Sequence, residues 1–121
     1  WTIEGAVTSQ FEQHLRAVLD YPLGSTAPRA AVCVMANVLA AGTPPTMGTD
    51  ERLHHLMARY PEVKVHLYAK PERPGRKIGH VTVLGAQLAP VRETAAASAT
   101  FLATGTWPDG YPVHGPVQET A

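Results

Sequence analysis

The chain has 121 residues, which is enough for one domain and too few for two. Apolar residues make up 45% of it and charged residues 17%, a composition that predicts a compact core and excludes a disordered chain. Ten basic and ten acidic side chains cancel, so the overall charge predicts neither a nucleic-acid partner nor a membrane surface.

The first predicted element is a helix that begins after Ser9 and ends before Pro22. Ser9 and Glu12 have the spacing of a capping box, in which both side chains bind free N–H groups of the first turn. An apolar stripe follows at helical spacing and consists of Phe11, Leu15, Val18 and Leu19. Ahead of the helix, the residues from Trp1 lack the basic start and apolar stretch of a secretory signal, which favours a cytoplasmic location. Because no initiator Met precedes Trp1, we expect a piece of a longer protein.

The apolar run over residues 31–39 predicts a buried strand, since it is short and rich in β-branched residues. It is far shorter than the roughly 18 residues that a membrane span needs. Cys33 is the only cysteine, which excludes an internal disulfide, and its apolar setting predicts a small core residue rather than a nucleophile. Asn37, the one amide of the run, is expected either at a bulge or pointing into a site.

A second helix and a pair of strands follow. Prolines and glycines in residues 42–48 predict a loop, after which Thr49-Asp50 supplies the N-cap of a helix that Pro61 ends. Alternating side chains predict a strand over Val63–Tyr68, and Ile78–Leu84 is a second β-rich run. The residues between the two strands predict a hairpin-like connection, because prolines and a glycine restrict its path.

A final helix is predicted to start at Ala89, with Pro90 in its first turn. One face of it holds small or apolar side chains suited to close packing, namely Val91, Ala95, Ser98 and Leu102. From Gly105 onward, closely spaced Pro and Gly predict an irregular or disordered tail. The order helix, strand, helix, strand, strand, helix indicates an α+β fold.

The connection between the two strands carries the strongest chemical signal. Residues 64–80 hold five basic side chains and one acid, a net charge of +4 that the neutral total hides. Arg offers a planar fork and Lys a mobile charge, and Gly75 allows close backbone approach, so the segment suits a phosphate group. The same composition also fits a solvated basic turn. Nucleic acid is disfavoured, because the connection has no aromatic residue that would stack on a base.

The histidines predict no metal site. His54 and His55 are adjacent, so on a helix they point about 100° apart and do not share one ion. His66 and His80 are expected to face each other across the strand pair as partly buried sheet residues. No ligand-spaced motif, nucleophile elbow, phosphate-cradling glycine loop or dinucleotide fingerprint occurs. The residues by themselves therefore support one phosphate-binding hypothesis and no catalytic residue.

Three stretches of the chain carry motifs of one known family. They are residues 1–17, the strand Val34–Leu39, and residues 65–81 with the sequences Tyr68-Ala-Lys70 and Arg73-Pro-Gly-Arg-Lys-Ile-Gly-His80. Together, over about residues 1–104, they resemble the N5-carboxyaminoimidazole ribonucleotide synthetases, which are ATP-grasp ligases of purine biosynthesis.

The resemblance implies a C-terminal portion of such an enzyme. Residues 1–29 would end the central ATP-grasp domain, residues 30–104 would form a small β-rich C-terminal domain with flanking helices, and residues 105–121 would be the tail. The intact enzyme would use ATP, Mg²⁺ and bicarbonate to carboxylate 5-aminoimidazole ribonucleotide, as a cytoplasmic homodimer. Its ATP and Mg²⁺ residues would all lie before Trp1. This segment would then bind neither group and would be inactive without the N-terminal part of the same protein.

The resemblance also assigns roles within the connection. Lys70 and Arg76 match the positions that bind the substrate's 5′-phosphate, while Arg73 and Lys77 are possible supplementary residues. Ala69 stands where the family often has Gly, so a backbone with positive φ at this position would tilt the segment. The competing hypothesis is a non-catalytic module that binds a phosphate or a protein partner.

Overall fold

Seven elements follow one another in residues 1–114, the part of the chain that the computed structural model describes. The helices are α1 (Thr2–Gly5), α2 (Gln10–Val18), α3 (Thr49–Arg59) and α4 (Leu88–Thr104), and the strands are β1 (Val32–Leu39), β2 (Lys64–Leu67) and β3 (Lys77–Gly85). This order confirms the predicted α+β class and adds α1, which the sequence did not predict. No helix in residues 1–114 combines the length and the apolar character needed to cross a membrane.

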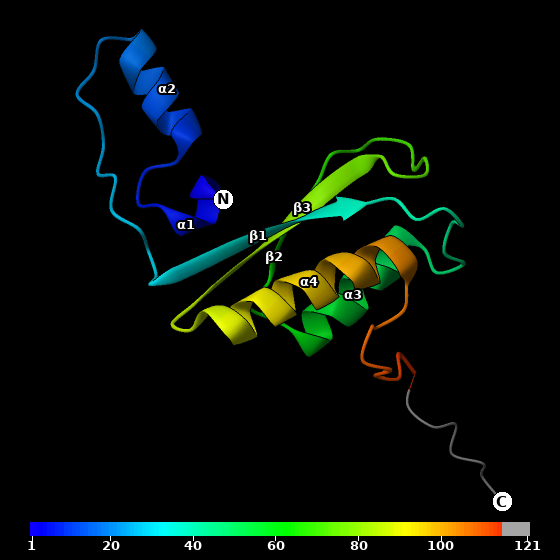
Figure 1. Cartoon of the computed structure of the whole chain (residues 1–121). Coiled ribbons are helices and arrows are strands. Elements are labelled where there is room, and N and C mark those ends of the chain that lie inside the picture. Colours follow the sequence, from blue (N-terminus) through cyan, green and yellow to red (C-terminus); the bar gives the residue numbers. More distant parts are fainter. Residues whose placement is uncertain (115–121) are drawn as a thin grey trace, which may run out of the picture.

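The strands form one antiparallel sheet with β3 in the centre and β1 and β2 at its edges. His80 of β3 lies opposite Asn37 of β1 on one side and opposite His66 of β2 on the other. Because strand residues alternate between faces, these three side chains share one face, which we call the open face because neither α3 nor α4 lies on it; α1 contacts part of it. The opposite face carries core residues such as Val81 and Val83, and α3 and α4 lie on that side (Figure 1).

Helix α4 covers the sheet as its sequence predicts. Its predicted small-residue face is buried throughout, and Phe101 and Leu102 complete the same surface. Helix α3 contributes Leu56, which is fully buried. The predicted cap of α3 is wrong: Gly48 is the N-cap and Thr49 is the first helical residue, so the Thr49 hydroxyl instead accepts a hydrogen bond from Arg52 at 3.1 Å.

Helix α2 begins as predicted, with the Ser9 Oγ accepting a hydrogen bond from the Glu12 N–H at 3.1 Å. None of its residues is buried. The prediction of a buried strand over residues 31–39 is also wrong, because β1 is an edge strand and only Val38 within it is buried. Cys33 is only partly buried and does not belong to the core, so its predicted core position is wrong. Burial raises the pKa of its thiol, which agrees with the prediction that it is not a nucleophile.

Residues 105–114 contain no helix or strand, as their Pro and Gly content predicts, yet one of them is packed into the core. Trp107 is only 2% exposed and stacks on Phe101 with ring centroids 4.1 Å apart. A composition-based prediction misses this contact, because one buried indole can anchor a segment without secondary structure. The remainder of the predicted tail, residues 115–121, lies outside the described residues.

Candidate functional site

The predicted basic connection is a loop whose backbone is attached to the end of β1. We call residues 69–77 the basic loop. The Gly75 N–H donates to the Ala40 carbonyl and the Ala40 N–H donates to the Arg76 carbonyl, each at 2.8 Å. Inside the loop, the Arg76 N–H donates to the Arg73 carbonyl at 2.9 Å. These bonds satisfy loop backbone groups and hold the loop in one path, which a simple surface turn would not require.

The only acid of the basic loop is paired with a residue outside it. Glu72 accepts a hydrogen bond from Arg52 of α3 at 2.8 Å, and Arg52 is only 3% exposed. The same guanidinium donates to the Leu102 carbonyl near the end of α4. Arg52 therefore joins the loop to both helices and neutralises the carboxylate of Glu72.

The four cations of the loop keep their charges available. Within residues 1–114, no carboxylate lies within 4.0 Å of the charged groups of Lys70, Arg73, Arg76 or Lys77. Arg76 is half-buried and the other three are exposed. Unpaired cations that lie close together repel one another. An anion bound among them would relieve that repulsion.

Two of the four predicted site residues meet at one ring. The Nζ atoms of Lys70 and Lys77 lie 5.6 and 5.7 Å from the centre of the Tyr68 ring. At this separation each ammonium interacts favourably with the face of the aromatic ring. Neither Arg73 nor Arg76 forms a side-chain hydrogen bond with any residue of the described range 1–114.

A hydrogen-bonded network on the open face holds Tyr68 in place. The Tyr68 hydroxyl and Nδ1 of His80 share a hydrogen bond of 2.5 Å, and the His80 ring stacks on His66 with centroids 4.7 Å apart, which confirms that the two histidines face each other. His66 in turn donates from Nε2 to Glu4 of α1 at 2.5 Å. Burial, reinforced by His66, lowers the pKa of His80, so its ring is neutral at pH 7.

The backbone at Ala69 has a φ of +51°. This is the positive φ at which a Cβ at this position is expected to tilt the segment. A residue with a Cβ is strained in this left-handed region by about 1–2 kcal/mol. The strain falls at the point where the chain leaves β2 and enters the basic loop. The backbone conformation that orients Lys70 is therefore destabilised by the strain at Ala69.

Several residues of the site are absent from the sequence prediction. Tyr68 was recognisable as the last residue of an alternating strand and as part of the Tyr68-Ala-Lys70 motif, but no role of its ring was predicted. Glu4 and Arg52 carry no signal, since their partners lie 62 and 20 residues away along the chain. Each of the three supports the loop or the open face through a contact that only the folded chain creates.

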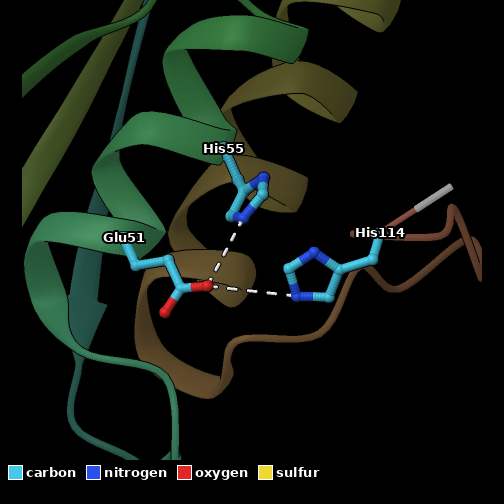
Figure 2. Close-up of side chains that lie close together, drawn as sticks. All are labelled: Glu51, His55 and His114. Atoms are coloured by element: carbon cyan, nitrogen blue, oxygen red, sulfur yellow. Dashed lines mark ion pairs between the residues drawn. The ribbon is translucent and has the colours of Figure 1, made fainter.

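One group of side chains in residues 1–114 has the composition of a metal site (Figure 2). Glu51 and His55 lie one helical turn apart on α3, and His114 approaches them from the segment after α4. Their ligand atoms all lie within 4.8 Å of one another. Two imidazoles with one carboxylate do not suit Mg²⁺, which prefers oxygen ligands, so this part of the chain offers no fitting Mg²⁺ site.

Comparisons with known proteins agree with one another. The family model of the phosphoribosylaminoimidazole carboxylase C-terminal domain matches residues 33–94. The N5-carboxyaminoimidazole ribonucleotide synthase of Mycobacterium tuberculosis is 60% identical over 114 residues, which cover 94% of this chain and 27% of that protein. The chain thus spans little more than a quarter of the length of this curated relative.

Two solved structures share the fold. The N5-carboxyaminoimidazole ribonucleotide synthetase of Thermus thermophilus has 42% identity and a TM-score of 0.61, with 89% of this chain and 27% of that chain covered. The N5-carboxyaminoimidazole synthase of Aspergillus clavatus, solved with ADP and 5-aminoimidazole ribonucleotide, has 32% identity and a TM-score of 0.66. That match covers 84% of this chain and 27% of the fungal one.

Proposed function

The chain belongs to the phosphoribosylaminoimidazole carboxylase C-terminal domain family, and from this premise we propose that it is the C-terminal portion of an N5-carboxyaminoimidazole ribonucleotide synthase. The intact enzyme uses ATP and bicarbonate to carboxylate 5-aminoimidazole ribonucleotide in purine biosynthesis. The part played by this chain is to anchor the 5′-phosphate of the ribonucleotide in the basic loop. The relative solved with that ribonucleotide supports the choice of ligand.

The observation that carries the proposal is the charge balance of the basic loop. Its one acid is neutralised by Arg52, whereas its four cations have no carboxylate partner within residues 1–114. A 5′-phosphate carries close to two negative charges and accepts several hydrogen bonds, which this loop is equipped to donate. Lys70 and Arg76 are the proposed phosphate ligands, with Arg73 and Lys77 supplementing them. Each charge-assisted contact would contribute about 1.5–3 kcal/mol to binding.

ATP and Mg²⁺ are assigned to the part of the enzyme outside this chain. Within residues 1–114, the three-residue group able to hold a metal contains two imidazoles, a donor set that does not suit Mg²⁺. In this proposal the segment binds the substrate, and the chemical steps take place on residues outside this chain. The homodimeric assembly and the cytoplasmic location of the intact enzyme are parts of the same proposal.

The boundary near residue 30 in the proposed domain division follows the burial pattern, whereas the boundary at residue 104 does not, because Trp107 is buried in the core. Residues 1–29 belong to the edge of the central ATP-grasp domain, and the apolar stripe of α2, exposed in this chain, supports that assignment. Residues 30–104 form the C-terminal domain, in agreement with a family match that starts at residue 33. Residues 105–121 follow it as the tail.

Steady-state kinetics of the intact synthase test the anchoring role. We expect Lys70→Ala and Arg76→Ala each to raise KM for 5-aminoimidazole ribonucleotide at least about tenfold, while KM for ATP changes little. Arg92→Ala is the matched control, because Arg92 is an exposed cation in the first turns of α4, at the end of the sheet remote from the basic loop (Figure 1). Unchanged ribonucleotide kinetics in both loop variants would refute the role.

The alternative, a phosphate-binding module that works without the rest of an enzyme, has one favourable observation. The basic loop is held entirely by contacts within this chain, to Ala40 and to Arg52. Calorimetric titration of 5-aminoimidazole ribonucleotide into the 121-residue chain separates the two hypotheses. Tight binding that Lys70→Ala abolishes would favour the module, whereas weak or absent binding is expected for a segment that supplies only the phosphate anchor.

A further inference from the structure

The segment after α4 is fixed against α3, and this places His114. Trp107 is buried beside Phe101, and the Arg59 guanidinium stacks on the Tyr111 ring with 4.0 Å between its carbon and the ring centre. Arg59 also donates to both carboxylate oxygens of Asp109, at 3.1 and 2.5 Å, and this pairing lowers the pKa of Asp109 to about 2. The segment is thus held at several points over the residues that precede His114.

His114 lies beside a turn of α3 that carries two side chains able to bind a metal, Glu51 and His55. Nε2 of His55 lies 3.7 Å from Oε1 of Glu51, and Nε2 of His114 lies 3.9 Å from the same oxygen. The two imidazole rings meet edge to face with centroids 5.2 Å apart. All three side chains point into the same small space between α3 and the tail (Figure 2).

We propose that Glu51, His55 and His114 form a binding site for a divalent transition-metal ion, with Zn²⁺ as the best fit. Imidazole nitrogen and carboxylate oxygen are the ligands that Zn²⁺ takes in tetrahedral sites, at about 2.0–2.2 Å, and a His₂Glu set leaves the fourth position to water. Bonds of that length place neighbouring ligand atoms about 3.3 Å apart. The two separations from the Glu51 oxygen, 3.7 and 3.9 Å, approach this value, and the ligand nitrogens of His55 and His114 lie within 4.8 Å of each other, so rotations of the three side chains would complete the site.

The physical reason for binding is charge and donor type together. Glu51 supplies one negative charge in the first turn of α3, and both histidines offer neutral nitrogens once they are deprotonated. Bound metal would join His114 of the tail to His55 of α3, so it would stabilise the packing of the tail on that helix. This site is independent of the basic loop and of the proposed synthase activity.

The test is calorimetric titration of Zn²⁺ into the 121-residue chain produced without a histidine tag. We expect saturable binding of one ion, with Kd raised about tenfold or more by His55→Ala and by His114→Ala. His54→Ala is the matched control, because His54 neighbours His55 on the same helix, is exposed and does not belong to the three-residue group. Titration with Mg²⁺ is expected to give no binding.

A second control removes the other imidazole–carboxylate pair of the described residues. His66 lies 2.5 Å from Glu4, so His66→Ala must leave the strong Zn²⁺ binding unchanged. His114 is 70% exposed in its side chain, so its replacement leaves the fold intact and keeps the test decisive. Equal weakening by His54→Ala and His55→Ala, or binding that survives His114→Ala, would overturn the proposal and leave the three groups as ordinary ion pairs.

Discussion

Helices α2 and α4 each carry a stripe of apolar or small side chains at helical spacing, but the stripe is exposed in α2 and buried in α4. The apolar stripe of α2 is more than half exposed at every position, from Leu19 at 57% to Val18 at 67%, whereas Phe101 on α4 is fully buried. The N-terminal region, residues 1–30, is tied together by polar bonds, such as the pair that joins the Gln13 amide to the Gly24 backbone at 2.8 and 2.9 Å. The region from 31 to 114 is held by a shared apolar core.

The contrast teaches that an amphipathic pattern identifies a face that needs cover but not the structure that covers it. In the sheet region the cover is α4, which lies within this chain. For α2 the described residues provide none, which agrees with the proposal that residues 1–29 belong to a larger domain. Three pairs of matched substitutions, one residue from each region, test how far the two regions differ.

The largest difference is expected for the only two phenylalanines of the chain. Phe101→Ala should cost about 3–5 kcal/mol, because it opens a cavity in the core and removes the stacking partner of Trp107. Phe11→Ala should cost less than about 0.5 kcal/mol, since this side chain is already in water. Urea-induced unfolding followed by circular dichroism measures both, and similar costs would mean that α2 is covered in solution.

A smaller difference is expected for two Arg–Glu pairs. Arg52→Ala leaves Glu72 and the Leu102 carbonyl without their donor in a mostly buried site, which should cost about 2–3 kcal/mol. Arg16 pairs with Glu12 at 3.4 Å on the exposed side of α2, so Arg16→Ala should cost only about 0.3–0.5 kcal/mol.

The Arg52 variant also has a functional readout. Loss of this side chain frees Glu72 to attract the neighbouring cations of the basic loop, which should weaken phosphate binding in the intact synthase. Guanidinium chloride would screen the charges, so urea is the denaturant of choice for comparing the two variants. A stability loss in Arg16→Ala that matched that of Arg52→Ala would contradict the distinction between buried and exposed pairs.

The smallest difference concerns two residues with positive φ that are not glycine, Ala69 at +51° and Asp20 at +56°. Ala69→Gly should raise stability by about 1 kcal/mol, because it removes Cβ strain that exceeds the entropy lost by glycine. Asp20→Gly should raise it less, since Asp adopts this conformation more readily than Ala. Thermal unfolding measures both changes, and a destabilising Ala69→Gly would show that the loop entrance is not strained.

Much of the fold follows from local signals that the sequence carries by itself. Ser9 places the start of α2, Pro61 stops α3, and the alternation of residues 63–68 identifies β2. The basic loop was also recognisable, because unpaired cations between two strands stand out in a neutral chain. These signals act over a few residues, where backbone geometry leaves few choices.

Tertiary structure alone decided which groups meet. The partner of Glu72, Arg52, is 20 residues away along the chain. Trp107 is a core residue although it lies in a segment that composition predicts to be irregular. His114 contacts His55, although β2, β3 and α4 lie between them in the sequence. Burial of β1 was mispredicted for the same reason, since an apolar face is buried only when another element covers it. Charge and periodicity are properties of a segment, whereas burial and ligand geometry are properties of pairs of segments, and the pairs exist only once the chain has folded.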